Sequence, residues 1–64
     1  MSNLLLVSVD MYRDAQWRGL VDDMRNLMAE GLHTRENFVT HHAIKRGFTY
    51  TEARAALIEA GEKP

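Results

Sequence analysis

The sequence lacks cysteine, a clear excess of either charge, and any long apolar run. Without cysteine the chain can form neither a disulfide nor a thiolate metal site. Its 8 Lys and Arg residues against 9 Asp and Glu residues give a formal net charge of −1. This balance disfavours non-specific nucleic-acid binding, which depends on cations that neutralise phosphates.

The apolar run near the start covers only Leu4 to Val7. A bilayer span takes about 20 such residues, and no Lys or Arg precedes the run as one would in a signal peptide. We therefore expect no membrane association and a cytoplasmic location.

Sequence motifs that carry catalysis or bind a cofactor are also missing. The four glycines are isolated, so none forms a phosphate-binding loop, and Ser8 lies between valines without the glycines of a nucleophile elbow. His33, His41 and His42 do not have the spacing of metal ligands on one helix face. We therefore predict a protein that is not an enzyme and that has no cofactor, no metal and no catalytic residue.

What is present is a short chain with the composition of a folded domain. It has 64 residues, of which 45% are hydrophobic and 27% are charged. We expect a single domain over residues 1–64. A chain of this length buries only about 60% of the surface that its unfolded form exposes. Small domains without disulfides or metals often self-associate, so we expect a homodimer.

The fold predicted from the sequence is mainly α, with a short N-terminal extended segment, one long helix and two shorter ones. Residues 1–10 are predicted as an extended arm, because Leu4 to Val9 is rich in Leu and Val and has no breaker. Asp10 is the expected N-cap of the long helix.

The long helix is predicted over residues 11–30, with Gly31 as its C′ residue. It would be roughly 30 Å long, which is more than we expect the rest of the chain to cover. Six apolar residues recur with helical spacing and form one stripe, for which we expect a place in the shared core of a dimer. They are Trp17, Leu20, Val21, Met24, Leu27 and Met28.

Two shorter helices are predicted over residues 34–46 and 50–60. Thr34 is the expected N-cap of the first, and Gly47 ends it. Thr49 and Glu52 have the spacing of a capping box at the start of the second. Gly61 closes that helix.

Aromatic and arginine side chains are the features that favour binding to another protein. The chain has five aromatic residues, more than a core of this size can hold, and Arg, Trp and Tyr are frequent hot-spot residues in interfaces. The predicted partner-binding residues are Arg18, Arg25, Phe38, Ile44 and Tyr50.

The alternative is a dimeric helix-turn-helix regulator that binds DNA. Two short helices joined by a turn containing glycine have the outline of that motif. Its DNA-contacting candidates are Lys45, Arg46, Thr51 and Arg54. Against this alternative, the last helix carries Glu52 and Glu59 beside a single arginine, whereas a helix that reads a groove brings several cations or amides to the DNA.

The general layout resembles a family of small phage proteins. It combines small size, an apolar N-terminal segment, an amphipathic first helix bearing Arg25 and a following helix with Phe38. This layout is similar to that of phage-encoded quorum-sensing anti-activators, which bind LuxR-type transcription factors. The resemblance implies a helical homodimer that occludes a host protein, with Arg25 and Phe38 as contacts. The function expected is therefore that of a phage or mobile-element protein that inhibits or modulates a bacterial host protein.

Overall fold

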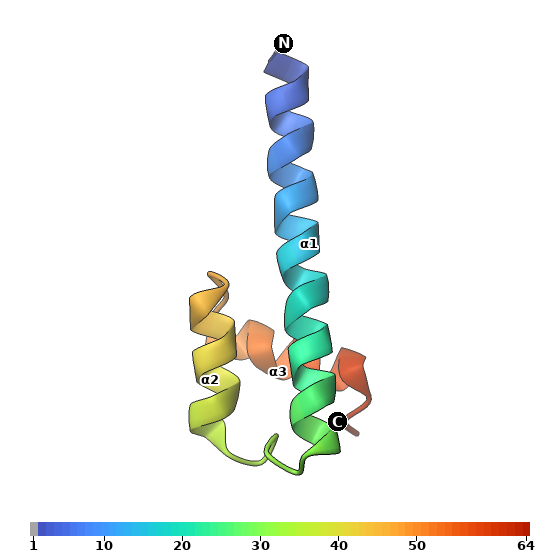
Figure 1. The fold of residues 1–64 in the computed structure, drawn as a ribbon, viewed down its shortest axis with the longest axis vertical. Helices are drawn as coiled ribbons and strands as arrows, with labels where there is room; N and C mark the ends of the chain where they lie inside the picture. The colour runs from blue at the N-terminus through green and yellow to red at the C-terminus, as the bar shows by residue number, and fades with distance from the viewer. Residues whose placement is uncertain (1) are drawn as a thin grey trace.

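The computed structural model describes the backbone of residues 2–64 and the side chains of residues 10–64. Three helices make up this part of the chain, with no strand: α1 (Ser2–Ala29), α2 (Glu36–Lys45) and α3 (Tyr50–Ala60). In Figure 1, α2 runs alongside the C-terminal half of α1, and α3 crosses behind both helices. The mainly helical fold class predicted from the sequence is confirmed.

The N-terminal segment differs from the prediction. The extended arm expected over residues 1–10 is wrong for the described part, because α1 begins at Ser2; Met1 lies outside the described residues. Leucine is among the better helix formers, and no glycine or proline occurs before Gly19, so nothing interrupts a helix extending back from its packed half. Asp10 therefore lies inside α1 and caps no helix.

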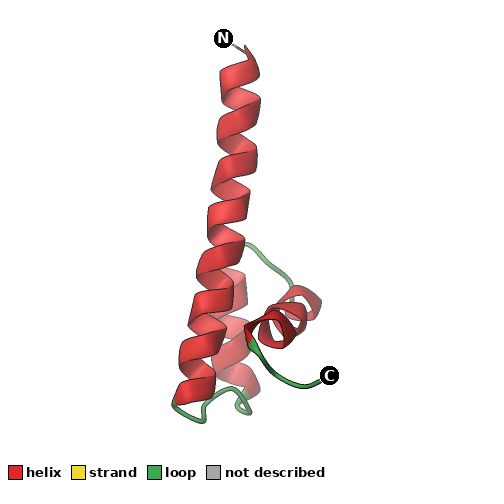
Figure 2. Cartoon of the chain, turned by 90° about the vertical axis from the view of Figure 1, so that its right-hand side faces the viewer, coloured by secondary structure: helices red, strands yellow, loops and turns green. Residues whose placement is uncertain are grey.

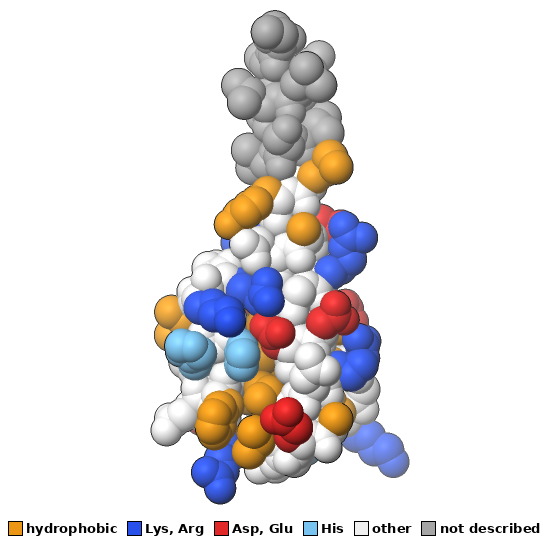
Figure 3. All heavy atoms as spheres, in the orientation of Figure 1, with side chains coloured by type: hydrophobic (Ala, Val, Ile, Leu, Met, Phe, Trp, Pro, Cys, Tyr) orange, Lys and Arg blue, Asp and Glu red, His pale blue; other side chains and the backbone are white. Residues whose placement is uncertain are grey.

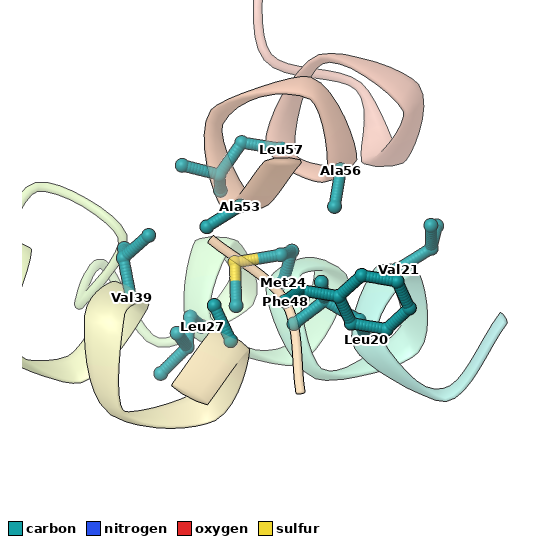
Figure 4. Close-up of a cluster of buried hydrophobic side chains, with 10 residues drawn as sticks. Leu20, Val21, Met24, Leu27, Val39, Phe48, Ala53, Ala56 and Leu57 are labelled. Atoms are coloured by element: carbon teal, nitrogen blue, oxygen red, sulfur yellow. The ribbon is translucent and has the colours of Figure 1, made fainter. Parts of the chain in front are cut away.

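The hydrophobic core forms between the C-terminal half of α1 and the other two helices. From the predicted stripe, Leu20, Val21, Met24 and Leu27 are at most 5% exposed. Trp17 and Met28 pack at the edge of the core. The core is completed by six residues from α2, α3 and the turn between them: Val39, Ala43, Phe48, Ala53, Ala56 and Leu57. Most of them are labelled in Figure 4.

One chain therefore covers its own apolar stripe, and the premise that 64 residues are too few to do so is wrong. The predicted stripe lies along the C-terminal half of the long helix, and α3 crosses that half with small residues, Ala53 and Ala56, facing it (Figure 4). Within the stripe, only Trp17 and Met28 keep part of their surface exposed.

Local interactions set the ends of the helices. After α1, the Leu32 N–H donates to the Leu27 carbonyl (2.8 Å) across Gly31, which has a φ of 73° as a left-handed C′ residue requires. The N-cap of α2 is Arg35, which makes no side-chain cap bond, so Thr34 as the expected cap is wrong. The capping box predicted for α3 is confirmed: the Glu52 N–H donates to the Thr49 hydroxyl (3.2 Å), and the Thr49 N–H donates to the Glu52 carboxylate (2.9 Å).

Candidate functional site: the outer face of α2

The side of α2 that points away from the core carries the strongest candidate surface. Val39 and Ala43 are buried, so the 3.6-residue period turns five exposed residues outward. We call these residues the outer face of α2: Asn37, Phe38, His41, Ile44 and Lys45. Phe38 is 40% exposed and Ile44 is 65% exposed, one helical turn to either side of His41. Large apolar side chains this open to water mark a contact surface when they gather on one face.

Cations flank these apolar side chains. Arg35 precedes α2 and Lys45 ends it, both are exposed, and neither forms an ion pair with any described side chain. Figure 3 shows the histidines over α2 with Lys and Arg side chains above them and hydrophobic atoms close by. Glu36, the acidic residue of α2, accepts a hydrogen bond from Tyr50 instead of pairing with a cation.

The other arginines are paired within the chain. Five of them lie within 4 Å of a carboxylate: Arg13 with Glu52, Arg18 with Asp14, Arg25 with Asp22, Arg46 with Asp23, and Arg54 with Glu62. Apart from Lys63 in the tail, the cations without such a partner among the described residues are therefore those beside the outer face. The positive charges of Arg35 and Lys45 are therefore available to acidic groups of a binding partner.

A polar network holds α2 against α1. The Arg46 guanidinium donates through Nε to Asp23 Oδ2 (3.1 Å) and through Nη1 to the Gln16 side-chain oxygen (3.0 Å). His42 Nδ1 lies 3.2 Å from the same Asp23 oxygen but makes no hydrogen bond. These contacts fix the rotation of α2 and thereby keep the outer face turned to solvent.

Tyr50 joins α2 to α3. Its hydroxyl donates to Glu36 Oε1 (2.7 Å), and this hydrogen bond to the carboxylate raises the pKa of the Tyr50 hydroxyl. The ring remains 41% exposed. Tyr50 therefore holds the start of α2 to the start of α3 and also offers ring surface to a partner.

A second cluster joins α1 to the turn before α3. Arg13 lies 4.2 Å from the centroid of the Phe48 ring, and its Nη1 donates to the Gly47 carbonyl (3.3 Å). Trp17 meets Phe48 edge to face at 5.4 Å and donates through Nε1 to Glu59 (3.1 Å). Two of the five aromatic residues are thus used in packing the fold, which leaves Tyr12, Phe38 and Tyr50 exposed.

The predicted partner-binding residues fall into two groups. Phe38 and Ile44 both lie on the outer face of α2, and Tyr50 lies at the start of α3. Arg18 and Arg25 lie on α1 instead, and each is paired with an aspartate three or four residues before it, at 2.9 and 2.8 Å respectively.

The predicted DNA-contacting residues are less available. Lys45 and Thr51 are exposed. Arg46 is held by Asp23 and Gln16, and Arg54 donates to Glu62 at 2.8 Å. Among these four candidates, Lys45 is the cation that keeps its charge free of a carboxylate within the described residues.

Sequence reasoning missed several exposed residues. Met11 and Tyr12 are 64% and 67% exposed on α1, and Ile58 is 45% exposed on α3. A signal existed for Ile58, because it follows Leu57 of the predicted apolar face and adjacent helical residues point about 100° apart. For Tyr12 the excess of aromatic residues was a general signal, and Met11 lies outside the predicted stripe, but their exposure depends on where α2 and α3 end.

Neither a pocket nor a cluster of three or more metal-ligating side chains (His, Cys, Asp or Glu) is found among the described residues. None of the described helices is long and apolar enough to cross a membrane. No family model, curated protein or solved structure matches the chain, so its function has to be inferred from its surface.

Proposed function

We propose that the protein is a small non-enzymatic binding protein that attaches to a bacterial host protein through the outer face of α2 and inhibits or modulates it. The resemblance of the sequence layout to phage-encoded anti-activators supports an origin in a phage or other mobile element, action in the host cytoplasm and a homodimeric state. It also supports a transcriptional regulator of the LuxR type as the class of partner.

One observation carries the proposal: two exposed apolar side chains, Phe38 and Ile44, lie between Arg35 and Lys45, which form no ion pair with a described carboxylate. Apolar anchors supply affinity in protein interfaces, whereas surrounding charge supplies orientation and a faster encounter. This combination fits a partner surface with apolar residues among acidic ones. Arg35 and Lys45 are the expected contacts for that acidic rim.

The proposal is tested by affinity capture from a bacterial lysate with tagged wild-type protein and three single variants. Ile44→Glu removes an anchor, and Lys45→Glu reverses a rim charge. Ile58→Glu is the matched control, because it places the same acid at an exposed isoleucine on α3, outside the outer face. We expect a host protein that the wild type and I58E capture, that I44E loses, and that K45E captures more weakly.

We also expect capture of the host protein to weaken as the salt concentration rises, because salt screens the attraction between Arg35 or Lys45 and acidic residues of the partner. The proposal is overturned if no host protein is enriched over a tag-only control, or if I44E and K45E capture the same protein as well as the wild type does.

DNA binding remains the second candidate function, favoured by the arrangement of α2, a short turn and α3 in Figure 1. The internal pairing of Arg46 and Arg54 is unfavourable for it, because phosphate contacts require available cations. A gel-shift titration against genomic fragments at low salt distinguishes the two functions. We expect no shift; sequence-selective, salt-sensitive binding would replace the protein-binding proposal.

A further inference from the structure

The N-terminal part of α1 stands apart from the rest of the molecule. In Figures 1 and 2 the helix runs on well beyond α2 and α3. Arg13 is the first described residue along the chain that contacts another element, through Gly47, Phe48 and Glu52. We call residues 2–12 the N-terminal extension of α1.

The composition of the extension is that of a helix which needs cover. Asp10 is its one charged residue. Seven of its eleven residues are apolar: Leu4, Leu5, Leu6, Val7, Val9, Met11 and Tyr12. Its described side chains begin at Asp10, and among them Met11 and Tyr12 are 64% and 67% exposed. A helix of this length without tertiary contacts is marginal in water, because most helical stability in proteins comes from packing an apolar face.

We propose that the extension pairs with the extension of a second copy of the chain, antiparallel and centred on Val7, and that this pairing forms the homodimer. The inference rests on the homodimer of the proposed function and assigns its interface. Four of the six residues of the stripe from Trp17 to Met28 are buried within one chain, so the extension offers a second copy more apolar surface than the stripe does.

A second copy fits the extension because the segment is almost free of charge. Self-pairing brings together identical surfaces, so any charge near the axis would meet its own like charge. In an antiparallel pair centred on Val7, position 10 of one helix lies level with position 4 of the other. Each Asp10 is then separated from its counterpart, and the two three-helix bodies lie at opposite ends of the pair.

Parallel pairing is disfavoured by the residues that follow. Met11, Asp14 and Arg18 are spaced three and four apart, so they share one side of α1. A parallel pair that used Met11 would set Asp14 against Asp14 and Arg18 against Arg18. Antiparallel pairing keeps these charges beyond the overlap, which is about 16 Å long. So short an interface predicts a weak dimer, with a dissociation constant on the order of micromolar.

The oligomeric state of the purified full-length protein tests this interface. By sedimentation equilibrium we expect a concentration-dependent mass that approaches twice the 7.3 kDa of one chain. Val7→Glu and Met11→Glu place a charge in the proposed contact, so both should sediment as monomers. Ile58→Glu, on α3, is the matched control and should dimerise like the wild type.

The absence of cysteine permits a direct test of direction. Positions 3 and 11 lie level in the antiparallel pair, so a mixture of the Asn3→Cys and Met11→Cys variants should form the mixed disulfide under mild oxidation. M11C alone should cross-link poorly. Efficient cross-linking of M11C with itself would overturn the antiparallel register.

A monomeric mass for the wild type at about 100 micromolar would overturn the dimer itself, since even interfaces at the weak end of the specific range associate there. So would a dimer that V7E and M11E leave intact. Because these measurements contain no host protein, their failure leaves the capture test of the outer face of α2 unaffected, and failure of that capture leaves the dimer standing.

Discussion

At the scale of single residues, the structure explains why a glycine occupies position 19. It lies in the middle of α1, where glycine costs about 1 kcal/mol relative to alanine. A Cβ at this position would come within 2.8 Å of Arg46 Cζ. The missing side chain therefore leaves room for the Arg46 guanidinium to lie across α1 and reach Asp23 and Gln16.

A double-mutant cycle tests this role. In an Arg46→Ala background, Gly19→Ala should raise the free energy of unfolding by about 1 kcal/mol, the difference in helix propensity. In the wild-type background the gain should be smaller by about 0.5 kcal/mol or more, because the guanidinium must move and its contacts with Asp23 weaken. Urea denaturation of the four proteins measures the difference, and an equal gain in both backgrounds would contradict the role given to Arg46.

At the scale of elements, α2 and α3 are held in different ways. The start of α3 is stabilised locally, by the reciprocal bonds of Thr49 and Glu52. The start of α2 has no side-chain cap, and its described polar contacts to the rest of the fold come from Tyr50 at one end and from Arg46 and His42 at the other. The outer face of α2 therefore depends on tertiary contacts with both neighbouring helices.

The capping box makes α3 sensitive to pH. The hydrogen bond from the Thr49 backbone N–H lowers the pKa of the Glu52 carboxyl, and Arg13, 3.6 Å away, acts in the same direction. A carboxyl whose pKa is lower in the folded than in the unfolded state adds stability above its unfolded pKa. That contribution is lost as the pH falls through the lowered value.

We therefore expect Glu52→Gln to be less stable than the wild type at pH 7. The gap in the free energy of unfolding should narrow as the pH is lowered from about 4.5, near the ordinary value for Glu. Chemical denaturation of both proteins across this range measures the gap, and comparing them cancels the titration of the other carboxyls. A gap that does not change with pH would show that the charge of Glu52 adds nothing.

For the molecule as a whole, stability depends on one small core. The core gathers at the C-terminal half of α1 (Figure 4), so each fully buried side chain contributes a large share of the total. Leu57 and Ile58 are adjacent on α3 and differ sharply in environment: Leu57 is 0% exposed and Ile58 is 45% exposed.

This pair predicts contrasting effects of truncation. Leu57→Ala should lower the free energy of unfolding by about 2–5 kcal/mol, because it leaves a cavity between α3 and α1. Ile58→Ala should change it by no more than about 1 kcal/mol. Denaturation followed by circular dichroism measures both; similar losses for the two variants would contradict the observed burial.

Several features were determined by the sequence itself, because they depend on residues that are neighbours along the chain. The limits of α3 follow from its capping box and Gly61, and the buried stripe of α1 follows from the 3.6-residue period. The general form of two shorter helices after a long one was predictable in the same way. Ile44 was also recognisable, because the helical period places it away from the side that carries Val39 and Ala43.

Tertiary structure decided the rest, because contacts between distant residues have no local signature. A run such as Leu4 to Val9 suits strand and helix alike. It is helical because it continues α1 back from the half of that helix that packs in the core. The sequence did not reveal that α3 would cover the stripe of α1, or that Arg46 would lie over Gly19 while Lys45 stayed free of described carboxylates. Those choices arise from how the helices cross, and they separate the part of the surface used for folding from the part left for binding.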